Sequence, residues 1–545
     1  MNQIENSLKL ALKDAIKKSF DLDVEDILIE RPKDLSHGDY ASNVAMKICK
    51  LAKSKPLDVA NKILDNLDKA SANIDKVEIA GPGFMNFFMS SDSLTSVIAK
   101  ILTEKEQYGC SDYGQGIKYN IEYVSANPTG DLHPGHARGA AMGDSISRLM
   151  KMAGYDVTRE YYLNDAGNQI HNMALSLQAR YLQACGIDKA MPEDGYYGPD
   201  LIAIANELHD EVNDKYVEDT KENYEFFRAY GLKKELDKLK RDLKAFNVEF
   251  DIWSSEKSLY ERGLVEKALE ALKANGYTYM QDGALWLKTT NFNDDKDRVL
   301  VKSDGSYTYL MPDIAYHLDK LDRGYDKLVD LFGADHHSYI TRLKAAIQAL
   351  GYESDKLTVD IIQMARMIKD GQEFKLSKRS GKAVSLKDLL QEAGCDAVRY
   401  FFVSRAADTQ MDFDLDMATK KSNENPVYYA QYAHARMCSI LRQAENIEEA
   451  KTFDLIDHEK ELTLLKQLNE FTNVVVDCAT TRMPHKMCNY IQKLASDFHS
   501  FYNECKVIDM DNMELTKQRI ALVKACKITL GNALNSIGVS APEKM

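Results

Sequence analysis

Residues 116–163 contain the pattern that most restricts how this chain can fold: a strand, a glycine-bearing loop, a helix and a second strand. The run 116–125 (GIKYNIEYVS) is strand-like, and the loop 126–136 (ANPTGDLHPGH) leads into a helix rich in small residues that ends at Gly154. The run 155–163 (YDVTREYYL) again has the composition of a strand. A helix between two strands is the crossover of a βαβ unit, so the pattern predicts a parallel sheet in a Rossmann-like α/β domain.

His133 and His136 stand on either side of a Pro-Gly pair at the start of this helix. Unpaired N–H groups and the positive end of the helix dipole favour an anion at such a place. Two neutral imidazoles three residues apart would add donors on the same side of the first turn. The HxGH spacing alone fits two loop histidines without a function equally well, so a phosphate site needs further support.

That support comes from a cationic segment far downstream, 375–381 (KLSKRSG), which follows the strand-like run 360–364 (DIIQM). An early HxGH and a late KxSK together resemble the paired signatures of the class I aminoacyl-tRNA synthetases. The resemblance implies that both segments bind the triphosphate of ATP.

Length and composition set the broad class of the chain. With 545 residues it is expected to form two to four domains. No apolar run reaches membrane-spanning length, and charged residues interrupt the first helix-like segment, so we expect a cytoplasmic protein without contact to a membrane. Nine cysteines without a CxxC pair predict reduced thiols and no structural metal. The net charge of −14 argues against indiscriminate nucleic-acid binding, including DNA, but allows a local basic face for RNA.

Changes in pattern along the chain predict three domains. Residues 1–112 form an α+β N-terminal domain, in which His37 and Asp39 are interpreted as loop and capping residues. Residues 113–405 form the catalytic domain, interrupted over about 170–260 by a helical insertion whose acidic run suits a solvated surface better than a metal site. Residues 406–545 are expected to be an all-α domain, because the pattern there is helical almost throughout.

Several segments resemble one group within class I, the arginyl-tRNA synthetases. They cover essentially the whole chain in the order expected for that family, and comprise SHGDYASNVAM, AGPGFMNFF, EYVSANPTGDLHPGHARGAAMGD, YYLNDAGNQI, YTYLMPDIAYHLDK, GADHHSYITR, DAVR, NPVYYAQYAHARMCSI and LGNALNSIGVSAPEKM. The resemblance implies an arginine–tRNA ligase with an N-terminal domain that touches the tRNA elbow and a C-terminal domain that binds the anticodon.

The resemblance also assigns site residues position by position. It implies catalytic roles for His133, His136, Lys375 and Lys378. It places ATP against Asn127, Gly135, Gly333, Asp335 and His337, and arginine against Glu122, Ser125, Asn127, Tyr309 and Asp313. Leu376 stands where the lysine signature usually has Met, which is a tolerable apolar exchange. Arg379 replaces the commoner Ser and leaves open which cation lies nearest the leaving phosphates.

The two acidic residues of this set suit a guanidinium, which is always charged and offers five donors in a planar fork. Glu122 ends a strand-like run, and Asp313 follows another, SYTYLM, so both are expected at the carboxyl ends of strands, where open α/β sheets bind ligands. Either acid alone would more commonly be a surface or capping residue. With the resemblance, we expect Asp313 to meet the guanidinium, whereas Glu122 meets either that group or the α-amino group.

The remaining expectations follow from the same resemblance. ATP, L-arginine and tRNA are the partners, Mg²⁺ is carried by the phosphates of ATP without a protein metal site, and the chain acts as a monomer. Tyr428, Tyr429 and Tyr432 either stack anticodon bases or pack within the helical domain. Two other functions remain open, namely another HxGH nucleotidyltransferase and a non-catalytic tRNA-binding paralogue.

Overall fold

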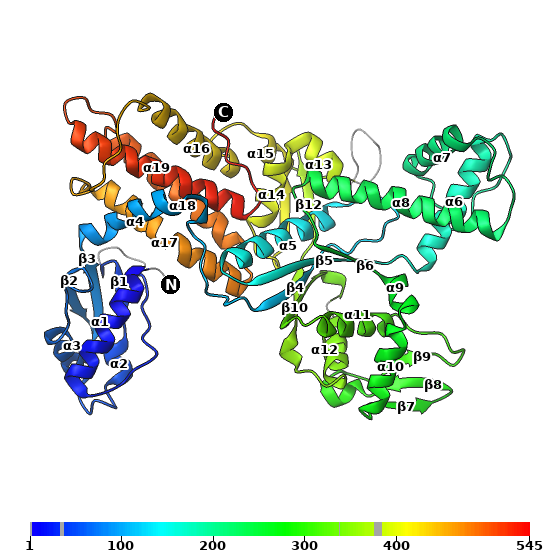
Figure 1. The fold of residues 1–545 in the computed structure, drawn as a ribbon, viewed down its shortest axis with the longest axis horizontal. Coiled ribbons are helices and arrows are strands. Elements are labelled where there is room, and N and C mark those ends of the chain that lie inside the picture. The colour runs from blue at the N-terminus through cyan, green and yellow to red at the C-terminus, as the bar shows by residue number, and fades with distance from the viewer. Residues whose placement is uncertain (1–2, 33–36, 337, 375–383) are drawn as a thin grey trace.

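A five-stranded parallel sheet lies at the centre of the molecule (Figure 1). The computed structural model describes residues 3–32, 37–336, 338–374 and 384–545. In the sheet the strand order is β11-β10-β4-β5-β6, and every neighbouring pair is parallel. The first strand of this sheet, β4, is therefore central, and the order reverses between β4 and β10, as in doubly wound nucleotide-binding folds. The strands are β4 (Lys118–Glu122), β5 (Asp156–Leu163), β6 (Ile252–Ser255), β10 (Lys327–Gly333) and β11 (Leu357–Ile362).

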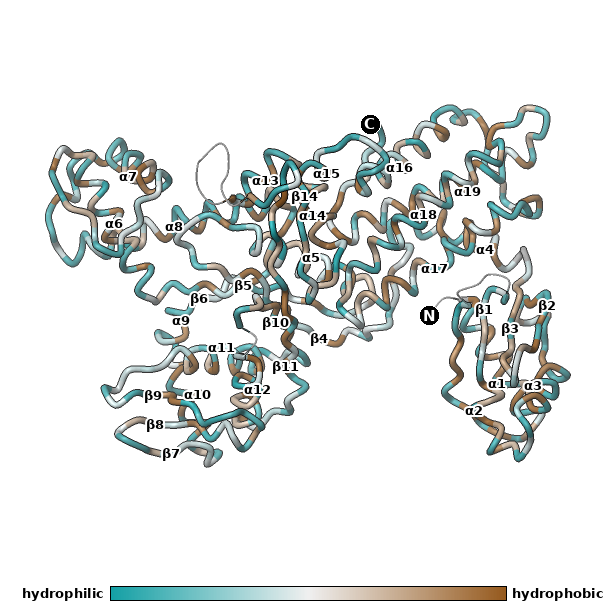
Figure 2. Tube along the Cα trace, turned by 180° about the vertical axis from the view of Figure 1, so that it is seen from behind, coloured by the Kyte–Doolittle hydropathy of each residue, from teal (hydrophilic) through white to brown (hydrophobic). Residues whose placement is uncertain are grey.

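Helix α5 (Pro134–Met152) connects β4 to β5 and packs closely on one face of the sheet. Its small residues allow this approach, because a Cβ atom at Gly143 would lie 2.2 Å from Cγ of Tyr123. Ile121 of β4 and Val329 of β10 belong to the same buried core, and Figure 2 shows hydrophobic colouring along β10. The predicted βαβ unit and Rossmann-like fold class are confirmed.

The other face of the sheet is covered by α11 (Leu310–Asp322) and α12 (Tyr339–Ala349). Leu321, Leu343 and Ile347 from these helices pack with Leu328 and Leu357 of the sheet in a separate buried cluster. Because side chains alternate along a strand, this face receives Asn120 and Glu122 of β4 and Asp330 of β10. Buried polar and charged side chains of the sheet therefore lie against helix α11 on this face.

Two insertions interrupt the sheet. The first is helical, as expected for about residues 170–260; its last helix ends at Ala245, before the short strand β6, which carries no apolar run that would reveal it. The second insertion was not predicted and contains a small antiparallel sheet of order β7-β8-β9. The elements are α6 (Asn168–Ala184), α7 (Pro199–Val212) and α8 (Lys221–Ala245), then α9 (Glu256–Glu261), α10 (Leu264–Ala274), β7 (Thr278–Gln281), β8 (Ala284–Leu287), η3 (Thr289–Phe292) and β9 (Arg298–Val301).

After β11 the chain forms a three-stranded sheet of order β13-β12-β14 with three helices. Strand β14 lies in the stretch 406–545 that we expected to be all-helical, so that expectation was wrong over its first residues. Pairing with β12 from the preceding domain stabilises β14, and such a distant partner is not visible in local periodicity. The elements are η4 (Ala334–His336), η5 (Ser354–Lys356), β12 (Ala365–Lys369), β13 (Gln372–Glu373), α13 (Leu386–Ala393), α14 (Cys395–Val403), β14 (Met411–Asp414) and α15 (Leu415–Thr419).

Four long helices form the C-terminal domain, as the helical pattern predicts. Their buried faces share one core with α4 and α5, so the domain packs directly on the catalytic domain. Arg482 at the end of α17 binds Asp360 of β11 through two contacts of 2.5 and 3.1 Å between guanidinium nitrogens and carboxylate oxygens. The helices are α16 (Pro426–Gln443), α17 (Glu459–Thr481), α18 (His485–Glu504) and α19 (Met513–Ser536).

The N-terminal domain projects from the body of the molecule and is attached to α17 (Figure 1). Nζ of Lys466 lies 2.5 Å from Oδ1 of Asp39, and Nε of Arg31 lies 2.7 Å from Oε2 of Glu470. Asp39 lies in a loop, as expected, but it is not a helix cap: it accepts a hydrogen bond from the backbone N–H of Met89 at the end of β3. The elements are α1 (Gln3–Phe20), β1 (Tyr40–Ser42), α2 (Val44–Ile48), α3 (Pro56–Asp65), β2 (Ile74–Ala80), β3 (Phe84–Met89), α4 (Ser91–Glu104) and η2 (Lys105–Gln107).

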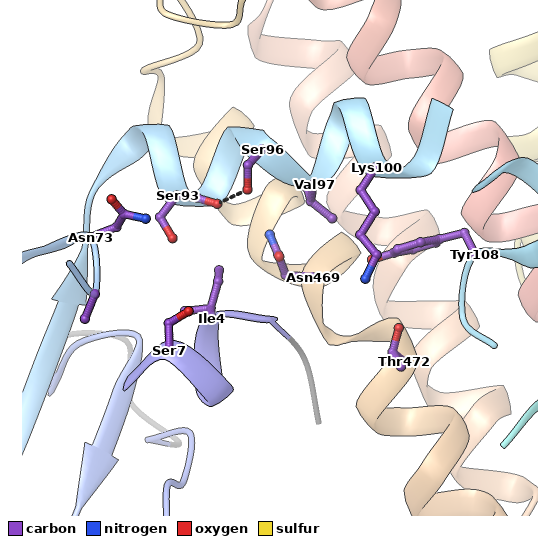
Figure 3. Close-up of a pocket in the computed structure, with 11 residues that line it drawn as sticks. Ile4, Ser7, Asn73, Ser93, Ser96, Val97, Lys100, Tyr108, Asn469 and Thr472 are labelled. Atoms are coloured by element: carbon purple, nitrogen blue, oxygen red, sulfur yellow. Dashed lines mark hydrogen bonds between the residues drawn. The ribbon is translucent and has the colours of Figure 1, made fainter. Parts of the chain in front are cut away.

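A small polar cavity of about 60 Å³ lies where α1, α4 and α17 meet (Figure 3). Ser7 of α1 faces Lys100 of α4 and Asn469 of α17 across it. The volume suits a few water molecules rather than a substrate.

All nine cysteines are free thiols. None of the described helices has the length and apolar character that a membrane span requires.

Candidate functional site

A cavity of about 830 Å³ opens at the carboxyl ends of β4 and β10, where the strand order reverses. The second insertion supplies the wall opposite α5. The cavity is lined by ten of the thirteen residues that the sequence assigned to the site, namely Glu122, Ser125, Asn127, His133, Gly135, His136, Tyr309, Asp313, Gly333 and Asp335. The other three, His337, Lys375 and Lys378, lie outside the described residues.

His133 is the N-terminal cap of α5. Its Nδ1 accepts hydrogen bonds from the backbone N–H groups of Gly135 and His136, at 3.1 and 3.3 Å. Nδ1 of His136 in turn accepts from the backbone N–H of His133 at 3.4 Å, and the two rings stack with centroids 3.6 Å apart. Because each Nδ1 is an acceptor, the proton of each neutral ring is on Nε2, which leaves one N–H donor per ring.

Both histidines are neutral near pH 7. Burial lowers the pKa of His133, and burial together with the neighbouring imidazole lowers the pKa of His136 to about 4. Contrary to our expectation, two N–H groups of the first turn are not free for an anion, because the ring of His133 already binds them. What α5 offers to an anion is therefore the helix dipole and the two imidazole donors.

The segment between β4 and α5 begins with a strained backbone. Val124 and Ser125 have φ angles of 71° and 39°, in a region that non-glycine residues rarely adopt and β-branched residues adopt least. The hydroxyl of Ser125 donates to Oε1 of Glu122 at 2.8 Å and accepts from the backbone N–H of Tyr162 at 3.1 Å. These contacts hold the sharp turn and orient the carboxylate that ends β4.

Asn127 and Gly333 continue the rim of the cavity. The side-chain amide of Asn127 donates to Oε1 of Gln169 at 2.7 Å, which ties the loop to the start of α6. Gly333 is the last residue of β10, and a Cβ atom there would lie 2.7 Å from Oδ1 of Asp335. This part of the wall therefore presents backbone next to an exposed carboxylate.

Asp313 lies in the first turn of α11 and not at the end of a strand, so our expectation for its local structure was wrong. The run SYTYLM has strand-like composition, but its last residues, Leu310 and Met311, begin the helix and pack in the core. Tyr339 of α12 donates a hydrogen bond to Oδ2 of Asp313. Burial raises the pKa of Asp313 to about 6, although this hydrogen bond acts in the opposite direction.

Glu256 is a wall residue that sequence reasoning missed. It begins α9, directly after β6, and it is 9% exposed. Burial raises its pKa, and its negative charge contributes to the raised pKa of Asp313. Among the described residues, neither Asp313 nor Glu256 has an ion-pair partner. The cavity wall thus contains two carboxyl groups without a counter-ion in the described part of the chain.

Tyr309 precedes α11 at the rim of the cavity and is 84% exposed.

Other buried carboxylates behind the cavity are paired by α11. Nζ of Lys320 lies 2.5 Å from Glu122 and 3.0 Å from Asp330, and Nη2 of Arg323 lies 2.9 Å from both carboxylate oxygens of Glu160. Of the residues that the structure describes, Asp313 and Glu256 are therefore the unpaired buried acids of the wall, whereas Glu122, Asp330 and Glu160 of the sheet are neutralised by neighbouring cations.

Comparison with known families separates the chain into three matching parts. Residues 97–437 match the family model of "tRNA synthetases class I (R), catalytic domain", residues 3–89 that of "Arginyl tRNA synthetase N terminal domain", and residues 430–545 that of "DALR anticodon binding domain". The parallel sheet and the cavity at its switch point are thus those of a class I aminoacyl-tRNA synthetase.

The relatives with the reported similarities all belong to one group within this class. The chain is 55% identical to the arginine–tRNA ligases of Bacillus velezensis and Bacillus subtilis, over 100% of this chain and 99% of each relative. It superimposes on a structure assigned to arginyl-tRNA synthetase from Campylobacter jejuni, with 34% identity and a TM-score of 0.77 over 84% of this chain and 100% of that one. The Thermus thermophilus arginyl-tRNA synthetase shares the fold, with a TM-score of 0.76 at 21% identity over 99% and 100% of the two chains. The chain belongs to the arginyl-tRNA synthetase family.

Proposed function

We propose that this protein joins L-arginine to its tRNA in two steps through an arginyl-adenylate, with release of pyrophosphate and AMP. The observation that carries the proposal is the cavity at the switch point of the sheet, which combines two unpaired carboxyl groups with a neutral histidine pair at a helix N-terminus. The end of the cavity with the two carboxyl groups suits a cationic group of a substrate, and the end with the histidine pair suits a triphosphate.

Asp313 binds the guanidinium of arginine, with Glu256 as a second acceptor. A planar fork of donors is best met by carboxylate oxygens, and both groups lie in the wall without a counter-ion among the described residues. Tyr309 closes the rim over the side chain. Glu122 and Ser125 meet the α-ammonium group, because the oxygens of Glu122 retain free lone pairs after their bonds to Lys320 and Ser125.

His133 and His136 donate through Nε2–H to phosphate oxygens of ATP, at the end of the cavity formed by α5. Asn127, Gly135, Gly333, Asp335 and His337 contact the rest of the nucleotide. Lys375 and Lys378 approach the triphosphate with compact positive charges on long stems. These roles rest on sequence similarity for the three residues that lie outside the described part of the chain.

In the first step, an oxygen of the arginine carboxylate attacks the α-phosphorus of ATP. A new phosphorus–oxygen bond forms, the bond to the bridging oxygen breaks, and pyrophosphate leaves with the negative charge. Such a reaction is accelerated mainly by positioning and by donors aimed at developing charge. Mg²⁺ enters with the phosphates of ATP and supplies further charge neutralisation; the described residues contain no cluster of three side chains suited to hold a metal ion.

In the second step, the arginyl group passes to a ribose hydroxyl at the 3′ end of the tRNA, and AMP leaves. We assign the tRNA elbow to the domain 1–112 and the anticodon to the domain 406–545, with 113–405 as the catalytic domain. The protein acts as a monomer in the cytoplasm and does not bind DNA.

The tyrosines of α16 pack within the helical domain. The ring centroids of Tyr428 and Tyr432 lie 6.3 Å apart in a stacked arrangement, and Tyr432 also stacks on His499. These contacts favour a packing role over contact with anticodon bases.

The decisive experiment is aminoacylation of unfractionated tRNA with ATP and each labelled amino acid in turn. We expect arginine alone to be attached. Charging with a different amino acid would overturn the substrate assignment. A folded protein that binds tRNA but forms no aminoacyl product would indicate the non-catalytic paralogue, whereas adenylylation of a small molecule without tRNA charging would indicate another HxGH nucleotidyltransferase.

A further inference from the structure

A continuous chain of charged groups at the base of the cavity joins the carboxylate of Glu122 to the backbone of Asp313. It begins at Glu122, whose Oε2 lies 2.5 Å from Nζ of Lys320. Lys320 lies 3.0 Å from Oδ1 of Asp330, and Oδ2 of Asp330 lies 2.7 Å from Nε2 of His317. Nδ1 of His317 then lies 2.7 Å from the backbone carbonyl of Asp313. The side chains of Lys320 and Asp330 are fully buried, and that of His317 is 4% exposed.

The geometry gives His317 a positive charge. Its Nδ1 faces a carbonyl oxygen, which can only accept, and its Nε2 faces a carboxylate that Lys320 keeps ionised. Both ring nitrogens must therefore carry a proton. Asp330 in turn raises the pKa of His317 against the effect of burial, with Lys320 and Glu122 as the other charged groups that act on the ring. Two cations and two anions alternate, so the chain is neutral as a whole.

We propose that Lys320, Asp330 and His317 are positioning residues that set the separation between Glu122 and Asp313, and thereby the length of the amino acid that fits between them. This inference rests on the proposed roles of those two carboxylates at opposite ends of arginine. Lys320 and His317 stand on α11 with Asp313, whereas Glu122 ends β4 and Asp330 is in β10. The charged chain therefore locks the helix that binds one end of the substrate to the strand that binds the other.

The same chain decides which acids remain available for substrate. Lys320 and His317 neutralise Glu122 and Asp330, and Arg323 neutralises Glu160, so the negative charge left for the guanidinium is that of Asp313 and Glu256. Removal of Lys320 leaves Glu122 and Asp330 buried without their common cation, a situation that favours protonation and movement of a carboxyl group. The expected defect is in arginine binding and in length selection, because the chain contacts Glu122 and the backbone of Asp313, the two residues assigned to arginine.

The test is ATP–pyrophosphate exchange by the full-length protein in the presence of tRNA, with Lys320→Met as the variant. We expect the KM for arginine to rise about 30-fold or more, because one member of a buried charge pair is lost, while the KM for ATP changes less than about twofold. Selectivity for arginine over homoarginine, which is one methylene longer, should fall. A purely structural role would lower the amount of active protein without changing this ratio.

Arg159→Met is the matched control. Arg159 on β5 is ion-paired with Asp251 at 2.8 Å, in the same sheet but away from the cavity wall, so its loss should lower stability and leave the KM for arginine and the selectivity unchanged. If Lys320→Met does not fold, His317→Gln is the variant that tests the proposal. The amide of glutamine is uncharged and cannot replace both ring donors, which bind Asp330 and the carbonyl of Asp313. The same rise in the KM for arginine and the same loss of selectivity are expected.

Two results would overturn the proposal. One is a folded Lys320→Met or His317→Gln protein with wild-type KM and wild-type selectivity. The other is an equal rise in the KM for ATP, which would indicate general distortion. Both differ from failure of the proposed function, in which the wild-type protein itself would show no arginine-dependent exchange.

Discussion

Oδ2 of Asp144 lies 2.6 Å from Nη2 of Arg399, and both side chains are fully buried between α5 and α14. The guanidinium of Arg399 also donates to the backbone carbonyls of Phe246, Asn247 and Ile537. One side chain therefore joins helix α5, the end of the helical insertion and the C-terminal segment. Arg399 is the last residue of DAVR, one of the segments that resemble the arginyl-tRNA synthetases.

Arg399→Met should strongly destabilise the protein. It leaves Asp144 with Arg148 and Arg159 as partners and removes one donor from each of three backbone carbonyls, and loss of one member of a buried ion pair costs about 3–5 kcal/mol. The midpoint of urea unfolding, followed by circular dichroism, measures the effect. Arg366→Met is the control, because Arg366 and Asp412 form an exposed pair, and such pairs contribute about 0–1 kcal/mol. Equal midpoints for the two variants would contradict the prediction.

Asp313→Asn should raise the KM for arginine about 100-fold, since the loss of a charged partner of a guanidinium costs about 3 kcal/mol or more. The KM for ATP should change little. Steady-state ATP–pyrophosphate exchange separates the two constants. Asp322→Asn makes the same chemical change on the last turn of α11, where the carboxylate binds exposed Lys267, and should leave both constants unchanged. A normal KM for arginine in Asp313→Asn would remove this residue from the binding site.

Activity should decline as the pH falls through about 6. Burial raises the pKa of Asp313 to about 6, so the free enzyme carries the anionic form above this pH and the neutral form, which cannot pair with a guanidinium, below it. We expect kcat/KM for arginine to fall with an apparent pKa near this value, whereas kcat at saturating arginine falls less, because a bound cation favours the ionised carboxyl group. The profile is measured between about pH 5 and 8. A profile that keeps this acid limb in Asp313→Asn would assign the titration to another group.

The two functions of His133 can be separated by substitution. His133→Asn retains a good N-cap for α5 but loses the Nε2–H donor, so the melting temperature should change little while the activation rate falls about 100-fold or more. His133→Ala loses the cap as well and should cost about 1 kcal/mol of stability in addition. His458 caps α17 in the same way, with its ring accepting from the N–H of Lys460 at 3.2 Å, so His458→Asn should leave the activation rate unchanged. Wild-type activation by His133→Asn would leave this histidine with the capping role alone.

Two glycines on α5 should respond in opposite ways to alanine. A Cβ atom at Gly143 would lie 2.2 Å from the ring of Tyr123, and forced overpacking costs about 1–3 kcal/mol. At Gly139 the nearest neighbouring atom would be 4.0 Å away, and alanine favours a helix by about 1 kcal/mol over glycine. Thermal unfolding of Gly143→Ala and Gly139→Ala measures the difference. A Gly143→Ala protein as stable as Gly139→Ala would show that Tyr123 moves aside without strain.

Local sequence signals predicted the part of the fold that depends on short-range order. The strand before Ala126, the helix after His133 and the strand before Asn164 are each visible in the alternation or spacing of neighbouring residues, and together they place the HxGH segment at the centre of a parallel sheet. The helical C-terminal domain was visible for the same reason. The positions lining the cavity were found through family resemblance, because their charges have no local pattern.

What the sequence did not reveal depends on distant pairing. Lys320 and Glu122 are 198 positions apart, so neither predicts the other as an ion-pair partner. Glu256 was hidden because β6 is too short to interrupt an apparently helical region. Asp313 was predicted to follow a strand because aromatic and β-branched residues precede it. In each case tertiary contacts outweigh the local preference.

The uncharged state of the histidine pair has a consequence for turnover. A permanent cation on α5 would hold pyrophosphate most tightly at the moment when it must depart, since the cleaved product bears more charge than the same atoms bore within ATP. Imidazole N–H donors exert a short-range attraction that ends once their hydrogen bonds break. Long-range attraction is left to cations that are not part of α5. We therefore expect the N-terminus of α5 to bind the phosphates of ATP without retaining pyrophosphate after cleavage.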